Sequence, residues 1–447
     1  MGHRLMVGVA ICAGVLAATG AGAMSPQPKG ALTFNKDIAP IVYKNCTACH
    51  RPGEVAPFTL ASYDDVKKRA TQIAALTESR VMPPWKADSH GEFHDERRLS
   101  ADEIGTLKQW VAEGTKEGSR ADLPPAPKFT PGWNLGTPDA TLTPSEDYSL
   151  AADGRDVYRC FVVPNPNDAD RYLSALEFRP GNRAVVHHVI AYLDTTGQGR
   201  KLDAADPGAG YSVEGGGIGF PPSGFLGGWA PGNYPRRLPE GVGIPWPKGA
   251  DIILQVHYHK SGKPETDRTR VGVYYCNGPV DKKLYTLPLM QPLLLIPPGK
   301  ADYTVSAELP VVFDASLLTV LPHMHLLGRS ITVSATLPDG TKKRLIHIPS
   351  WDFNWQNTYA WREPLKLPKG SRLSLTATYD NSTGNPHNPN NPPKLVTWGE
   401  QTTNEMCLAF LGFTVDAEHI TTGQTANVPS FGFGGRRRRL LSRPGTD

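Results

Sequence analysis

Residues 251–260, DIILQVHYHK, place apolar side chains at every second position from Ile252 to Tyr258. This period of two is that of a β-strand with one face in a core. Similar short runs, bounded by Gly, Pro, Asn and Asp, occur at 156–164, 184–194, 270–276, 330–340, 371–380 and 405–416. Helical patterning is almost absent from this region. We therefore predict a mainly β fold with two β-sandwich, jelly-roll-like subdomains, at 146–290 and 291–425.

The composition excludes several protein classes. The 447 residues include 45 Gly and 42 Pro, with 39% apolar and 20% charged residues, which excludes a coiled coil and a polytopic membrane protein. The formal charge of +4 lies in a predicted disordered basic tail, residues 426–447, with Arg436 to Arg439. Since the remaining chain is neutral, we expect no nucleic-acid partner.

The first residues resemble an export signal. Arg4 precedes an apolar stretch that ends in Ala21-Gly22-Ala23, which predicts a cleaved signal peptide over 1–23. An uncleaved N-terminal anchor is the alternative. We expect an exported protein, periplasmic or secreted, without a transmembrane segment after cleavage.

A small helical region follows over 31–118. It contains Cys46-Thr-Ala-Cys49-His50, the attachment sequence of a covalently bound haem c. With its short predicted helices, the region resembles a class I cytochrome c domain. Such a domain requires a second axial ligand, for which Met82 is our choice over His90 and His94. A redox or zinc pair is the other interpretation of the cysteines. A Pro-rich linker, 119–145, is predicted next.

Five histidines of the β region fall into three groups: His187 with His188, His257, and His323 with His325. Rings at i and i+2 of a strand point to one face, whereas adjacent rings share a ligand only at a bulge. Taken singly, each histidine is equally a hydrogen-bonded or surface residue. Imidazoles together with the thioether of Met406, without a carboxylate cluster, favour copper.

These motifs resemble, in order and spacing, the copper type II ascorbate-dependent monooxygenases. The resemblance runs from His187-His188 through Leu254 to Tyr258 and His323-x-His325 to Glu405-Met406-Cys407. It implies two copper ions, one held by His187, His188 and His257 for electron transfer. The other, held by His323, His325 and Met406, would bind dioxygen and hydroxylate a C–H bond of a small-molecule substrate.

The family pattern also directs attention to residues around the ligands. Gln255 and His259 share the strand face of His257 and are expected to support the ligands from behind. Leu321 and Phe410 occupy the positions at which peptide-hydroxylating members bind a carboxylate, so the resemblance implies a largely apolar substrate.

Two further expectations concern electrons and cysteines. The haem module would supply electrons, in place of or beside an upstream cytochrome or an ascorbate-like reductant. Cys160 and Cys276 are the predicted disulfide, which leaves Cys407 unpaired, and buried free thiols are the alternative. The alternative function is a periplasmic haem and copper electron-transfer or copper-binding protein without oxygenase activity.

Overall fold

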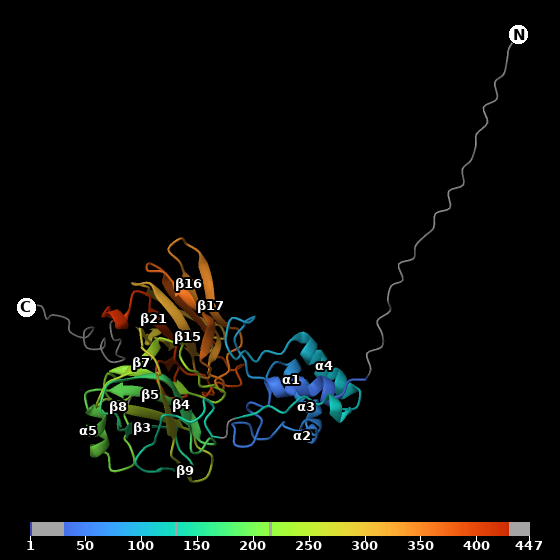
Figure 1. Ribbon diagram of the computed structural model, residues 1–447, viewed down its shortest axis with the longest axis horizontal. Coiled ribbons are helices and arrows are strands. Elements are labelled where there is room, and N and C mark those ends of the chain that lie inside the picture. The colour runs from blue at the N-terminus through green and yellow to red at the C-terminus, as the bar shows by residue number, and fades with distance from the viewer. Residues whose placement is uncertain (2–30, 130–131, 214–216, 429–447) are drawn as a thin grey trace, which may run out of the picture.

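The computed structural model describes Met1 and residues 31–129, 132–213 and 217–428. Figure 1 shows a small helical unit beside two stacked β-sandwiches. The mainly β prediction is confirmed for the described residues. The predicted signal peptide and Arg436 to Arg439 lie outside them.

The helical unit contains short helices around one core. Ser100 and Glu103 form a capping box at the start of α4. The core contains Phe34, Leu107 and Trp110, each at most 2% exposed. The helices are the π-helical turn η1 (Phe34–Ile38), α1 (Ala39–Asn45), α2 (Tyr63–Lys67), α3 (Ala70–Glu78) and α4 (Ala101–Ala112).

The first sandwich packs a five-stranded sheet, ordered β1-β10-β4-β7-β11, against a four-stranded sheet, ordered β3-β8-β5-β6. The first sheet contains β1 (Ala140–Leu142), β4 (Arg171–Arg179), β7 (Val242–Trp246), β10 (Arg270–Tyr275) and β11 (Lys282–Lys283). The second contains β3 (Val157–Val163), β5 (Val186–Asp194), β6 (Gly224–Trp229) and β8 (Asp251–Tyr258). A short pair, β2 (Tyr148–Leu150) with β9 (Glu265–Asp267), and helix α5 (Gln198–Ala205) complete it.

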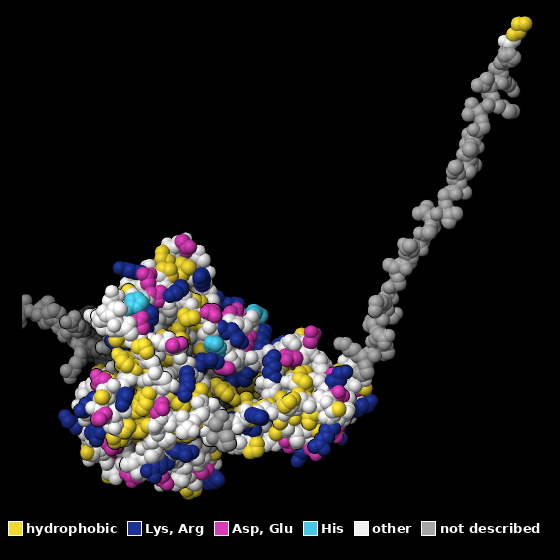
Figure 2. Space-filling model, in the orientation of Figure 1, with side chains coloured by type: hydrophobic (Ala, Val, Ile, Leu, Met, Phe, Trp, Pro, Cys, Tyr) yellow, Lys and Arg dark blue, Asp and Glu magenta, His cyan; other side chains and the backbone are white. Residues whose placement is uncertain are grey.

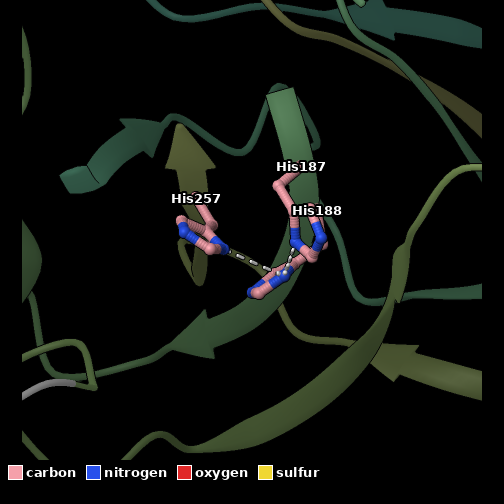
Figure 3. A group of neighbouring side chains, drawn as sticks. All are labelled: His187, His188 and His257. Atoms are coloured by element: carbon pink, nitrogen blue, oxygen red, sulfur yellow. Dashed lines mark hydrogen bonds between the residues drawn. The ribbon is translucent and has the colours of Figure 1, made fainter. Parts of the chain in front are cut away.

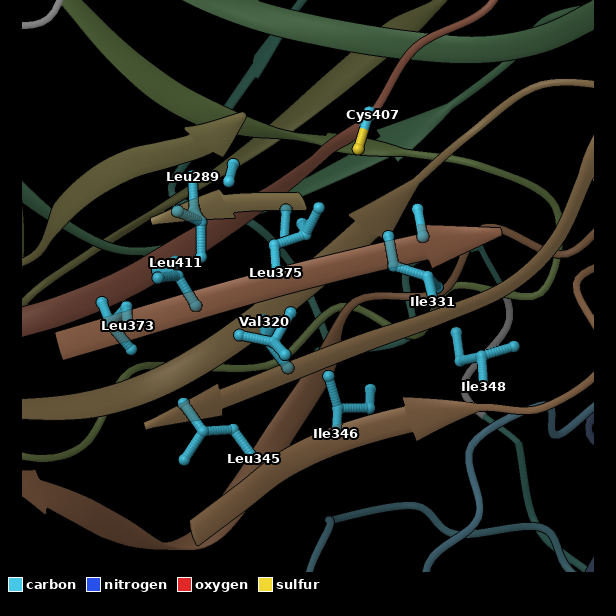
Figure 4. Packing of buried hydrophobic residues seen from close by; sticks show 14 of the residues in the cluster. Leu289, Val320, Ile331, Leu345, Ile346, Ile348, Leu373, Leu375, Cys407 and Leu411 are labelled. Carbon is cyan, nitrogen blue, oxygen red and sulfur yellow. The ribbon is translucent and has the colours of Figure 1, made fainter. Parts of the chain in front are cut away.

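The second sandwich packs two four-stranded sheets, ordered β12-β21-β15-β18 and β14-β19-β16-β17. Their facing side chains form a buried core, in which Val320, Ile331 and Leu375 have no solvent exposure (Figure 4). The first sheet contains β12 (Tyr285–Met290), β15 (Ala315–His323), β18 (Tyr359–Leu367) and β21 (Leu408–Val415). The second contains β14 (Tyr303–Pro310), β16 (Gly328–Thr336), β17 (Lys342–Ile348) and β19 (Arg372–Tyr379), and β13 (Leu295–Ile296) pairs with β20 (Val396–Thr397) nearby.

Three predicted boundaries need correction. Strand β12 pairs with β21, so the second sandwich begins near Tyr285 and not at 291. Strand β1 pairs with β10, so part of the predicted linker, 119–145, belongs to the first sandwich. Ala426 and Val428, placed in the tail, pack on the second core. In each case edge pairing or core packing extends beyond the alternating pattern visible in the sequence.

The segment 83–98, which we call the docking segment, leaves the helical unit between α3 and α4 and binds the second sandwich. Phe93, 2% exposed, pairs with Trp361 and lies in that sandwich's core. The His94 N–H donates to the Ala360 carbonyl at 2.8 Å. The assignment of all residues 31–118 to one helical domain is therefore wrong for this segment.

The predicted disulfide is also wrong, because the five described cysteines are free. Cys160 is buried on β3 with its Sγ 3.8 Å from the Gly217 carbonyl. Cys276 follows β10 in the opposite sheet, with its Sγ 3.7 Å from the Val242 carbonyl. The two thiols thus belong to different sheets and make separate contacts, while Cys407 is buried in the second core.

The visible surface mixes both signs of charge. Lys and Arg side chains intermingle with Asp and Glu over both sandwiches and the helical unit (Figure 2). Within the described ranges, every helix falls short of the length and hydrophobicity needed to cross a bilayer.

Candidate metal centres

Adjacent strands bring the three histidines of the first sandwich together. His188 on β5 pairs directly with His257 on β8, and the register shifts between Val186 and His188. The predicted bulge is thus present at His187, and it turns this ring to the same side as its neighbour. Figure 3 shows the three rings pointing toward one another. Their ligand nitrogens all lie within 4.8 Å of one another.

The facing atoms are all Nδ1. His188 Nδ1 lies 3.2 Å from His187 Nδ1 and 3.4 Å from His257 Nδ1. The His257 Nε2–H donates to Asp156 Oδ2 at 3.0 Å, which leaves its Nδ1 lone pair free for an ion. Ligands about 2.0 Å from a shared ion lie roughly 3 Å apart, so this donor set fits a metal.

Burial keeps these imidazoles neutral. It lowers the pKa of His187 to about 3, with a further contribution from His257. It also lowers the pKa of His188 well below the usual value, and the nearby His257 and His187 act in the same direction. The pKa of His257 is lowered by burial, although Asp156 opposes the change. Neutral imidazole is the form that binds metals.

The second sandwich carries the other pair. His323 ends β15 and His325 follows it, with the two Nε2 atoms 3.3 Å apart. The His323 Nδ1–H donates to Gln356 Oε1, and the His325 Nδ1–H donates to the Asn404 carbonyl at 3.1 Å. Both Nε2 lone pairs therefore face the same point. Burial lowers the pKa of His323 to about 4 and that of His325 well below its usual value.

Met406 lies in the loop directly before β21, the strand that pairs with β15. The β15–β21 pairing ends at His323 and Leu408, and His325 and Met406 each lie two residues beyond that end. Glu405, fully buried, accepts hydrogen bonds from the backbone N–H groups of His325, Leu327 and Met406 at 2.8, 2.6 and 3.2 Å. Burial raises the pKa of Glu405 to about 8. This carboxyl fixes the two ligand segments to each other.

Gln255 and His259 behave differently from the expectation. Gln255 is buried, and its Nε2 donates to the Gly217 carbonyl at 2.8 Å and reaches Glu400 Oε2 at 3.5 Å. These two contacts join the two sandwiches, and neither is with a histidine. His259 is exposed beyond the end of β8, and its backbone N–H donates to the Val185 carbonyl.

Leu321 and Phe410 are direct neighbours on β15 and β21. Leu321 shares its strand face with His323, two residues on. The Phe410 ring stacks on Phe225 of the first sandwich, with centroids 5.2 Å apart and planes at 7°. Two apolar side chains thus lie on the sheet that carries His323, and one of them contacts the first sandwich.

The preferred haem residues lie in the helical unit, whereas the two alternative axial ligands lie on the docking segment. Cys46, Cys49 and His50 follow α1, and the His50 Nδ1–H donates to the Phe58 carbonyl at 3.1 Å, leaving Nε2 available. Met82 stays with the helical unit, since its N–H donates to the Leu76 carbonyl at 3.1 Å.

The alternative axial ligands lie on the docking segment. His90 is 70% exposed and lies 3.8 Å from Asp88, in an ion pair when protonated. His94 is bonded through its backbone to β18. Both histidines therefore belong to a segment that is attached to the second sandwich.

Four residues that contact the histidines were not predicted from the sequence: Asp156, Phe353, Gln356 and Asn404. Asp156, Phe353 and Gln356 lie far from the ligands along the chain, so spacing does not reveal them, whereas Asn404 lies two residues before Met406 and contacts His325 through its backbone carbonyl. Tyr158 was not predicted either, although its ring stacks on His257 at 4.2 Å. Glu405 was detectable, because an acidic residue opens the otherwise apolar stretch 405–413.

Part of the chain matches a known protein family. Residues 286–425 match the family model of the copper type II ascorbate-dependent monooxygenase, C-terminal domain. This match covers less than half of the chain and contains His323, His325 and Met406. It supports copper-dependent monooxygenase chemistry for the second sandwich at a coarse level, whereas the three-histidine group lies before it.

Two curated proteins are similar to the chain. The DBH-like monooxygenase protein 2 of Mus musculus is 25% identical over 287 residues, 57% of this chain and 42% of the relative. The putative DBH-like monooxygenase protein 2 of Homo sapiens is 25% identical over 312 residues, 62% of this chain and 58% of the relative. The chain thus spans about half the length of these relatives.

Solved structures show only faint likeness. PNGase F, a glycosylasparaginase from Flavobacterium meningosepticum, is 13% identical with a TM-score of 0.25, covering 62% of this chain and 95% of that one. The major capsid protein P2 from bacteriophage PM2 is 8% identical with a TM-score of 0.25, covering 62% and 97%. Neither likeness carries an argument about this protein.

Proposed function

We propose that the protein is an exported copper-dependent monooxygenase that hydroxylates a C–H bond of a small, largely apolar molecule with dioxygen. The observation that carries the proposal is the orientation of the buried imidazoles. Each group turns its lone-pair nitrogens toward one point, while hydrogen bonds hold the opposite nitrogens of His257, His323 and His325. This arrangement is typical of metal ligands fixed from behind.

The ligand sets differ in the chemistry they favour. His187, His188 and His257 would hold one copper through Nδ1, a set suited to one-electron exchange. His323 and His325 would hold the other through Nε2, with the soft thioether of Met406 favouring Cu(I). Copper bound there would supply dioxygen activation.

The protein's own residues would position the substrate. Leu321 and Phe410 offer apolar surface beside the second centre, and Phe225 extends it from the other sandwich. Burial of apolar substrate surface contributes about 25 cal/mol per Å². Since neither Leu321 nor Phe410 can pair with a carboxylate, we propose alkyl or aromatic substrates over glycine-extended peptides.

We propose that a covalent haem c on the helical unit supplies electrons. The free Cys46 and Cys49 thiols and the available Nε2 of His50 fit this group. Met82 is the proposed second axial ligand, because it stays with the helical unit. Thioether ligation would raise the reduction potential relative to two imidazoles.

Metal and haem analysis of the copper-reconstituted protein tests the proposal. We expect two coppers and one haem per chain, and one copper in each of His187→Ala and His323→Ala. Absence of copper would contradict the function.

Oxygen chemistry is tested separately. Reduced haem should reoxidise when dioxygen and a panel of small aromatic and alkyl compounds are added, and ¹⁸O₂ should label the product. Reoxidation without labelled product from any compound, in a protein with two coppers, would favour the electron-transfer function.

A further inference from the structure

The loop 351–357, WDFNWQN, lies between β17 and β18 and places one aromatic ring between the two histidine groups. The Phe353 ring stacks on His187, with centroids 4.7 Å apart and planes at 17°. The same ring meets His325 edge-on, with centroids 5.7 Å apart and planes at 80°. The Phe353 ring therefore contacts one proposed ligand of each copper. The ring centroids of His187 and His325 are consequently no further apart than the sum of these two centroid distances.

Hydrogen bonds on both sides of Phe353 hold the ring in place. Gln356 Nε2 donates to the Phe353 carbonyl at 2.9 Å, while its Oε1 accepts from His323. Trp351 Nε1 donates to the His325 carbonyl at 3.1 Å. The loop is thus bonded to both histidines of the second centre, and Phe353 extends from it to the first.

The outer side of the loop binds the docking segment. Lys86 and Asp352 form an ion pair at 3.0 Å, with side-chain exposures of 13% and 28%. Asn357 Nδ2 donates to the Pro84 carbonyl at 3.3 Å. These residues follow Met82 closely in sequence, so the loop contacts the chain that leaves the helical unit as well as both metal centres.

We propose that Phe353 is the spacer between the two copper centres and sets the rate at which an electron crosses between them. This inference rests on the proposed function. A packed ring gives the electron a continuous path of van der Waals contacts and excludes water from the gap. Without the ring, the path would pass through a cavity or through mobile solvent.

The electron balance is that of a monooxygenase. One substrate C–H bond, one dioxygen, two electrons and two protons give one alcohol and one water. An upstream one-electron donor, haem c or an ascorbate-like reductant, supplies the electrons. Copper held by His187, His188 and His257 would give up one of these electrons, which would cross past Phe353 to copper held at the other centre.

Electron crossing is tested in the two-copper holoprotein with Phe353→Leu and Phe353→Tyr. Fully reduced protein is mixed with dioxygen and a compound that gives ¹⁸O-labelled product, and freeze-quench EPR follows the appearance of Cu(II) at each centre. We expect Phe353→Leu to slow oxidation of the three-histidine copper while both coppers stay bound. Phe353→Tyr, which keeps the ring, should restore most of the rate.

The matched control is Phe313→Leu, because Phe313 also stacks on an aromatic ring, that of Phe413 at 5.7 Å, beside the second core. It should keep the wild-type rate. A wild-type rate in Phe353→Leu would overturn the spacer, and so would a loss of copper from that variant, which indicates a ligand-holding role. Wild-type protein without two coppers would instead refute the proposed function, before any rate is measured.

Discussion

Replacing Asp156 by alanine should weaken copper at the three-histidine centre alone. The carboxylate accepts the Nε2–H of His257 at 3.0 Å and a hydrogen bond from the Thr402 hydroxyl at 2.5 Å. Without it, the ring of His257 loses the partner that fixes its tautomer and orientation. Loss of such a partner typically costs 10–100-fold in metal affinity, about 1.4–2.7 kcal/mol.

Competition between the metal-free protein and a copper chelator measures this change, with EPR to separate the two centres. Thr402→Val should have a smaller effect, because it removes only the second partner of Asp156. Asp147→Ala is the control, since Asp147 is 64% exposed and lies 3.6 Å from Arg268. Unchanged affinity at the three-histidine centre, or equal weakening at both centres, would refute the reasoning.

Three other outcomes follow from the structure. The metal-free protein should lose stability as pH falls from about 6.5 toward 4. In this range the histidines of the unfolded chain bind protons, whereas buried His187 and His323, with pKa values of about 3 and 4, do not. Urea unfolding at several pH values measures the slope, which should reach up to about 1.4 kcal/mol per pH unit and site and should shrink in His323→Ala. Asp206→Ala should lower the free energy of unfolding by about 3 kcal/mol, since Asp206 pairs at 2.7 Å with Arg159, which is 8% exposed; an unchanged urea midpoint would contradict this. Phe93→Ala should cost about 3–5 kcal/mol and expose the docking segment to limited proteolysis, whereas wild-type cleavage kinetics would argue against its docking.

The strand pattern and the histidine groups were predictable from the sequence, because both depend on local periodicity. Alternation identifies β8, and the adjacent His187 and His188 required the bulge that the structure contains. The partners of the ligands were not predictable. Asp156 and Gln356 reach their histidines only after distant strands have paired, and a single Asp or Gln in a loop has no distinctive pattern.

Two errors have physical causes of the same kind. The stretch SHGEFHD, 89–95, has the composition of a polar loop, yet Phe93 inserts into a core formed more than 200 residues later. The disulfide was inferred from cysteine number, whereas pairing depends on which sheet each thiol occupies. Tertiary packing decided both.

The docking segment also constrains how the helical unit moves. Both ends of the docking segment join the helical unit, at α3 and α4, while its middle packs in the core of the second sandwich. A redox group carried by the unit would therefore operate at a set separation from its acceptor and not by diffusional encounter. Electron delivery from this group would then be first order and insensitive to solvent viscosity and to protein concentration. A mutation that frees the docking segment would make delivery depend on diffusion of the helical unit, restricted only by the remaining covalent connection.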